Sequence, residues 1–148
     1  MQTHGDYAAR ARAGLAAQPM LQNMGVRAEE IAPGYMRLSM PFNAGFTQQH
    51  GFLHAGAVTA AMDSAAGFAA LTLMPEDAGV LTVELKSSLL RPAQGAVFGF
   101  EGRVVKPGRT LLFTEGLAWV EQDDGTRRDI ARLSATMMAV IGRDGIRG

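Results

Sequence analysis

The chain has 148 residues, 47% of them hydrophobic, and its 14 basic residues balance 14 acidic ones. This length predicts one domain with one hydrophobic core, and the balanced charge favours neither nucleic acid nor an anionic membrane as a partner. Because the sequence contains no cysteine, it excludes disulfides, thiolate metal sites and a cysteine nucleophile.

The first third of the chain predicts a helix and a hairpin. Residues 6–18 are rich in Ala, Arg and Leu and predict a short helix, ended by Pro19, within an N-terminal tail of residues 1–20. The start of the chain has no apolar secretory segment. Residues 26–31 and 35–41 flank the turn sequence Ala-Pro-Gly and predict a β-hairpin.

The best candidate for a long helix follows a loop over residues 42–53. Residues 55–73 are rich in alanine, lack proline and contain three β-branched side chains, and Pro75 follows them. The segment is apolar almost all round, as in a helix that a sheet encloses. Since it contains Asp63 and falls short of a clean span of about 20 apolar residues, we expect a cytoplasmic protein without a membrane anchor.

The second half of the chain predicts strands rich in β-branched, aromatic or alternating apolar residues. Clusters of Pro, Gly and Asp separate them, and such short turns favour antiparallel neighbours. We therefore expect one α+β domain over residues 1–148, an antiparallel sheet wrapped around one hydrophobic helix. The predicted strands cover residues 80–90, 97–106, 110–120 and 129–141.

Asp63 is the one ionisable side chain between residues 55 and 74. A buried carboxylate is costly, so this one should have a partner, lie near water or be neutral. Two structural alternatives stay open. The helix could break there, with Asp63 capping a second segment that begins at Ser64, or Asp63 could face solvent at a seam.

The start of the long helix offers a second chemical feature. The first amide groups of a helix have no intrahelical acceptor and carry the positive end of its dipole, so the N–H at His54 and Ala55 could hold a developing oxyanion. Gly51 and Gly56 would let a substrate approach the backbone. Alternatively, Gly51 serves only the loop and His54 only packs or caps.

The spacing of these two features bears on the assembly. Ala55 and Asp63 lie eight residues apart, about 12 Å along a helix, which is too far for one carbonyl group to touch both. Either the two features are unrelated, or a second copy of the chain lies antiparallel and brings its Asp63 to Ala55. The second case predicts a homodimer with two identical sites.

Further polar residues could join such a site. Gln48 can donate an amide hydrogen bond, and Thr82 can hydrogen-bond a carboxylate or a water. Arg91, Lys106 and Arg109 stand at strand ends, where cations could meet phosphates, although such residues are more often simply solvated.

No metal or cofactor is expected. Three histidines and Asp63 could suggest a metal site, but His4 lies in the tail, and His50 and His54 lack a third partner. The sequence also lacks a phosphate-binding glycine motif, a serine nucleophile elbow and a dinucleotide fingerprint.

The segment FTQQHGFLHAGAVTAAMDSAAG resembles the hot-dog fold thioesterases, in particular the branch of the phenylacetate-pathway (PaaI-type) acyl-CoA thioesterases. In that branch a loop with Asn and Gly leads to His-Gly-Gly, and an acidic residue follows nine positions after the His, as Asp63 follows His54. The segments LTVELKSSLLRPAQG and VVKPGRTLLFTEGLAWV resemble the family's later strands.

The resemblance implies roles for matching residues. Asp63 would be the nucleophile or general base, the Ala55 N–H the oxyanion donor, Gln48 the orienting loop residue, and Thr82 the hydroxyl beside the acid. Gln48 stands where the family has Asn, and Ala55 replaces its first Gly. The implied reaction is hydrolysis of acyl-CoA thioesters, aryl or short to medium chain, at sites shared across a homodimer that could pair again into a tetramer.

Two other functions are weighed against hydrolysis. A hydratase or dehydratase of enoyl or hydroxyacyl thioesters would need His54 and Asp63 to cooperate in one pocket. A module that binds acyl-CoA without turnover would need neither. Thiol release, loss of enoyl absorbance and binding alone distinguish the three.

Overall fold

The computed structural model describes residues 1–146 of the chain. Its helices are α1 (Tyr7–Ala16), α2 (Pro19–Met24) and α3 (Ala55–Leu71), with a single 3-10 turn at Ala44–Phe46. Its strands are β1 (Arg27–Ala32), β2 (Tyr35–Pro41), β3 (Ala78–Leu89), β4 (Val97–Lys106), β5 (Leu111–Glu121) and β6 (Arg127–Ile141). The six strands form one antiparallel sheet in the order β1-β2-β4-β5-β6-β3. The predicted α+β architecture is confirmed.

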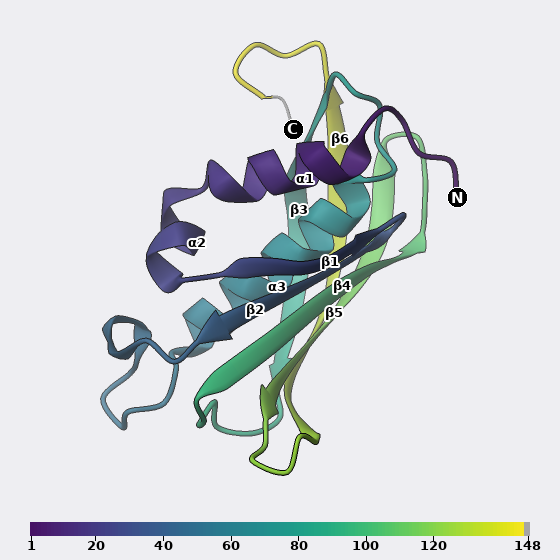
Figure 1. Ribbon diagram of the computed structural model, residues 1–148. Helices are drawn as coiled ribbons and strands as arrows, with labels where there is room; N and C mark the ends of the chain where they lie inside the picture. Colours follow the sequence, from purple (N-terminus) through teal and green to yellow (C-terminus); the bar gives the residue numbers. More distant parts are fainter. Residues whose placement is uncertain (147–148) are drawn as a thin grey trace.

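α3 runs across one face of this sheet (Figure 1). Small side chains let it lie close: a Cβ added to Gly102 of β4 would stand 2.3 Å from the backbone of Ala65. The aromatic side chains of β4, Phe98 and Phe100, are fully buried in the same core. The close contact of helix and sheet explains the run of alanines in α3, since larger side chains would hold the two apart.

The N-terminal region holds two helices rather than the predicted one. α1 ends at Ala16, before Pro19 as predicted, and Pro19 then begins α2, since proline suits the first position of a helix. Gly25 ends α2 in the left-handed conformation, with φ 79°. The segment that the sequence predicted as a tail of residues 1–20 is therefore folded, and α1 lies beside α3 (Figure 1).

The prediction that successive strands pair is wrong for β3 and β4. β3 pairs with β6 at one edge of the sheet, while β4 lies between β2 and β5. The connection has seven residues, 90–96, and can span about 24 Å when extended. Neighbouring strands are only about 4.8 Å apart, so a connection of this length reaches across two intervening strands.

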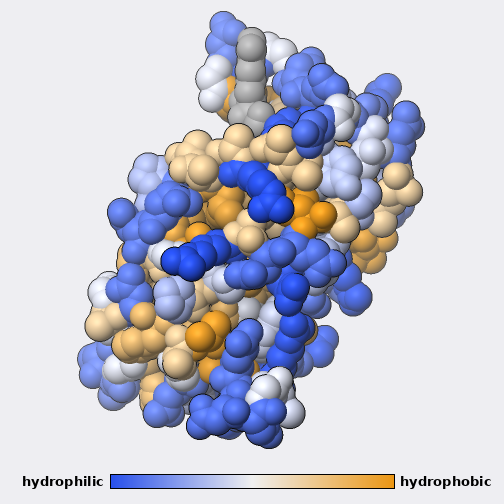
Figure 2. All heavy atoms as spheres, viewed as in Figure 1, coloured by the Kyte–Doolittle hydropathy of each residue, from blue (hydrophilic) through white to orange (hydrophobic). Residues whose placement is uncertain are grey.

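The edge strand β3 carries four exposed apolar side chains. Leu81, Val83, Leu85 and Leu89 of this edge strand are between 39% and 55% exposed. On the face shown in Figure 2, by contrast, hydrophobic residues form small areas between hydrophilic ones. Within residues 1–146, no helix is both long and apolar enough to cross a membrane.

Candidate active site

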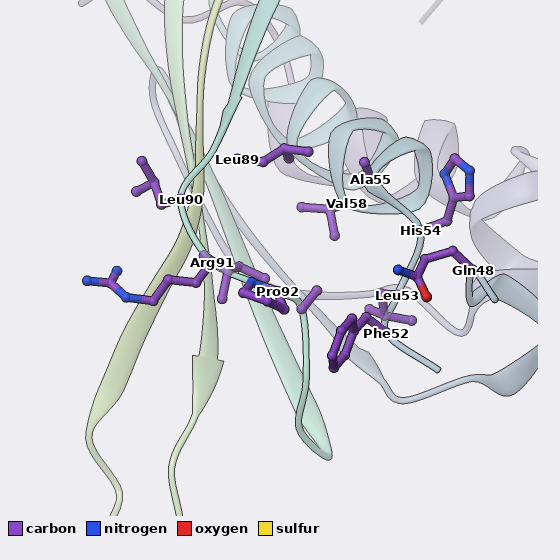
Figure 3. Close-up of a pocket in the computed structure, with 12 residues that line it drawn as sticks. Gln48, Phe52, Leu53, His54, Ala55, Val58, Leu89, Leu90, Arg91 and Pro92 are labelled. Atoms are coloured by element: carbon purple, nitrogen blue, oxygen red, sulfur yellow. The ribbon is translucent and has the colours of Figure 1, made fainter. Parts of the chain in front are cut away.

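A cavity of about 510 Å³ opens at the start of α3 (Figure 3). It lies between the loop before the helix and the connection that follows β3. Ala55 lies on its wall, and the remaining lining is mostly apolar, including Phe52, Leu53, Val58, Leu89, Leu90 and Ile130. The size and apolar lining are typical of a small-molecule site.

Backbone hydrogen bonds hold the loop that forms one wall of this cavity. The N–H of Gln48 donates to the carbonyl of Phe52 at 2.9 Å, and the N–H of Leu53 donates to Ala93 at 3.1 Å. The Gln48 side-chain oxygen accepts from the N–H of His50, which leaves its amide nitrogen directed into the cavity (Figure 3). The Gln48 amide is thus a hydrogen-bond donor on the wall of the cavity, and its contact with a substrate stays a prediction.

The first turn of α3 leaves one backbone donor in the cavity. The Nδ1 atom of His54 accepts from the N–H of Gly56 at 2.8 Å and so caps the helix. His54 therefore adopts the capping role that the sequence left open, and its ring points away from Phe52 and Pro92 (Figure 3). Among residues 1–146 the N–H of Ala55 has no acceptor. That N–H is the free donor at the positive end of the helix dipole.

Asp63 lies on the same helix but lines a different cavity, a hollow of about 210 Å³. The hydroxyl of Thr82 on β3 donates to Asp63 Oδ1 at 2.8 Å. Burial raises the pKa of Asp63 above its ordinary value, and the Thr82 hydrogen bond opposes that rise. A half-buried carboxylate with a raised pKa and one fixed hydrogen bond is suited to act as a base or nucleophile.

Within one chain, Ala55 and Asp63 do not meet. α3 is continuous through Asp63, so the alternative in which Asp63 caps a second helix is wrong. Eight helical positions separate the two by about 12 Å, and Ala55 and Asp63 line separate cavities. His54 and Asp63, the pair that a hydratase would need, are likewise apart in the single chain.

The three predicted cations lie in two places. Arg91 lies at the rim of the larger cavity, and its guanidinium donates to the Asp129 carbonyl at 2.8 Å and points away from Ala55 (Figure 3). Lys106 ends β4 and Arg109 follows it, at the opposite end of that strand from the connection that lines the cavity. Their contact with a substrate stays a prediction.

Some residues of these cavities have no signal in the sequence. Phe52, Leu89 and Ile130 come from three distant segments, and Gln18 reaches the Asp63 hollow from the N-terminal region. Only Phe52, an apolar side chain within a polar loop, could have been singled out beforehand. In the described part of the chain, no three His, Cys, Asp or Glu side chains gather where they could hold a metal ion.

Comparison with solved structures identifies the fold. A thioesterase family protein from Silicibacter pomeroyi is 48% identical, with a TM-score of 0.89 over 92% of this chain and 99% of that one. The Escherichia coli PaaI protein of the phenylacetic acid degradation operon is 13% identical, with a TM-score of 0.78 over 90% of this chain and 93% of that one. The predicted hot-dog fold is confirmed.

Sequence comparison agrees with this result. A Saccharolobus solfataricus protein named "Putative esterase SSO1253" is 37% identical over 92 residues, which cover 62% of this chain and 61% of that protein. Residues 50–126, which contain both the Ala55 and the Asp63 features, match the family described as Thioesterase superfamily. This chain therefore belongs to the thioesterase superfamily.

Proposed function

We propose that the protein hydrolyses acyl-CoA thioesters as a homodimer, at two sites that each combine Ala55 of one chain with Asp63 of the other. One observation carries this proposal. The Ala55 N–H, which could hold an oxyanion, and the Asp63 carboxylate, which Thr82 orients, lie on the same helix but in two different cavities. Each cavity holds half of a thioesterase site, and a two-fold axis unites the halves.

The uncovered face of α3 supports the dimer. The residues of α3 that are not buried recur in pairs one turn apart and form a stripe along its first half: Ala55, Gly56, Thr59, Ala60, Asp63 and Ser64. All six residues are small, so a second helix could lie close against this stripe. If the stripes of two copies pack antiparallel, Asp63 of each approaches Ala55 of the other.

The edge of the sheet supports the same arrangement. β3 is twelve residues long and pairs on one side only. Leu85 and Leu89 pair with residues of the core face of β6, yet they are 39% and 55% exposed. Long apolar edge strands readily pair with another chain. Antiparallel pairing of two β3 strands would cover these side chains and join two sheets into one.

The proposed hydrolysis uses both halves of the site, the Ala55 N–H of one chain and the Asp63 carboxylate of the other. The thioester carbonyl oxygen accepts a hydrogen bond from the Ala55 N–H, which stabilises the negative charge that develops there. The Asp63 carboxylate either attacks the carbonyl carbon, forming an anhydride that water then cleaves, or removes a proton from an attacking water. The C–S bond breaks, and the products are the free acid and the thiol of coenzyme A. No cofactor enters this scheme.

Activity assays on two single variants test this scheme. Ala55 is the first residue of α3, where proline is tolerated, so Ala55→Pro removes the N–H while keeping the helix. We expect thiol release from a panel of acyl-CoA esters, reduced about 100-fold or more in Ala55→Pro and in Asp63→Asn. Ala55→Gly keeps the N–H and serves as the control. Saturable binding without thiol release from the unmodified protein would overturn the proposal.

Mixing the two inactive variants tests the shared site. In a mixed dimer, one site carries both substitutions and the other carries neither. Random re-association should therefore restore about a quarter of the wild-type activity, because half of the dimers are mixed and each has one intact site of two. Sites confined to single chains would show no recovery. Light scattering of the same samples gives their molar mass and so tests the prediction that dimers pair into tetramers.

A further inference from the structure

We infer that the acyl group of the substrate occupies the hollow beside Asp63 and that Gly67 sets the size of acyl group accepted. This inference rests on the proposed function, since it assigns the two arms of the thioester to the two cavities. The reacting carbonyl carries a long thiol arm with phosphates at its far end and a smaller acyl arm. The two arms must leave the carbonyl in different directions.

The two cavities differ in size and in charge, as the two arms of the thioester do. The larger one, of about 510 Å³, has Arg91 at its rim, as a long arm that ends in phosphates needs. The hollow of about 210 Å³ has no cation, and Asp63 is the one ionisable side chain among the described residues that line it. The smaller, uncharged acyl arm therefore fits the hollow.

Gly67 leaves space in this hollow because it has no side chain. It lies four residues after Asp63, on the same face of α3, and a Cβ added there would have no neighbouring heavy atom within 4 Å. A glycine inside a helix costs about 0.5–1 kcal/mol relative to alanine. At Gly102 the close approach of α3 requires a glycine, whereas at Gly67 no neighbouring group within residues 1–146 requires one. The open space is instead available to a ligand.

The N-terminal helix fixes the wall of the hollow. Phe68 lines it and is 4% exposed, and Gly14 of α1 packs against the Phe68 ring. A Cβ on Gly14 would stand 2.7 Å from Cε1 of that ring, so a larger residue there would move the ring. The folded N-terminal segment thus limits how far the hollow extends.

The volume indicates the class of acyl group. A cavity of about 150 Å³ holds one benzene molecule. A hollow of about 210 Å³ therefore matches one aromatic ring or a chain of about six carbons in size, and fatty acyl chains of about twice that length would extend beyond it. The expected substrates are short-chain aliphatic and single-ring aryl thioesters.

The test is a chain-length profile of kcat/KM with acetyl-, butyryl-, hexanoyl-, decanoyl- and benzoyl-CoA. The unmodified protein should prefer hexanoyl- and benzoyl-CoA to decanoyl-CoA. Gly67→Val should lower the ratio of hexanoyl to acetyl turnover by about 10-fold or more, the scale of one or two methylenes in a hydrophobic pocket, and Gly67→Ala by less. Ala13→Val, which introduces the same side chain on the exposed side of α1, should leave the profile unchanged.

The outcomes separate this inference from the proposed function. If the unmodified protein hydrolyses none of the esters, the proposed function fails, and the inference fails with it. If it hydrolyses them but Gly67→Ala and Gly67→Val keep its chain-length profile, only the inference is overturned. Equal loss on every ester together with dissociation into monomers would assign Gly67 to a subunit contact and would also overturn the inference.

Discussion

At the scale of single residues, two opposing effects act on Asp63. Burial raises the pKa of its carboxyl, and the hydrogen bond from Thr82 counteracts that rise. If ionised Asp63 is the base or nucleophile, kcat/KM should fall on the acid side with a midpoint above the ordinary aspartate value of about 4. The Thr82 hydroxyl on β3 therefore keeps the pKa of Asp63 on α3 lower than burial alone would make it.

Replacing Thr82 tests this tuning. Thr82→Val removes the hydroxyl that stabilises the carboxylate, so the acid midpoint of kcat/KM should move to higher pH. Thr82→Ser keeps a hydroxyl and should keep the midpoint near that of the unmodified protein. The measurement is the pH dependence of thiol release. A midpoint that is the same in all three proteins would show that Thr82 has only a structural role.

The same raised pKa predicts a stability effect. A carboxyl whose pKa is higher in the folded state binds its proton more tightly there, so its contribution favours folding below the unfolded pKa and is lost as pH rises through the folded pKa. Asp63→Asn should therefore unfold at a higher temperature than the unmodified protein at pH 7, and this advantage should shrink toward pH 3. Thermal unfolding at fixed protein concentration measures both.

At the scale of elements, Arg10 of α1 holds the end of α3. Its guanidinium donates to the carbonyl oxygens of Leu71, Met74 and Pro75, the last two at 2.9 Å. Leu71 is the last residue of α3, and Met74 and Pro75 follow it, so Arg10 ties the end of α3 and the turn after it to α1. We expect Arg10→Met to lower the free energy of unfolding by about 2–3 kcal/mol, because carbonyls lose a charged donor. Arg12→Met, at an exposed position of the same helix, is the control in chemical denaturation, and equal losses in both variants would contradict this role.

At the scale of the whole molecule, the edge strand β3 decides whether the site is complete. Leu85→Lys would place a charge where two chains should meet, and we expect monomers with at least 100-fold lower activity, the scale of losing acid–base catalysis. Val105→Lys changes an apolar side chain of β4 that is 57% exposed and should affect neither property. Size-exclusion chromatography with light scattering, run beside the activity assay, measures both. An active Leu85→Lys monomer would contradict the shared site.

The local features of the site could be predicted from the sequence because they depend on neighbouring residues. The long helix starts at Ala55 as expected, since the polar loop, the capping His54 and the alanine run all act within a few positions. The position of Thr82 beside the acid was expected from the family resemblance rather than from a local pattern, and Thr82 does donate to Asp63. The limits of β2 and β4 were also predicted, because turn residues bound both strands.

The sequence by itself determined the segments, the anomalous carboxylate and the helix start with its free N–H, because propensity, capping and hydrophobic pattern are local. Only the tertiary structure decided that β3 pairs with β6 at an edge and that the first half of α3 keeps one face uncovered. The cavities belong to this second group, since Phe52, Leu89 and Ile130 meet only after folding. Pairing and enclosure depend on contacts between distant segments, and no short stretch of sequence specifies these.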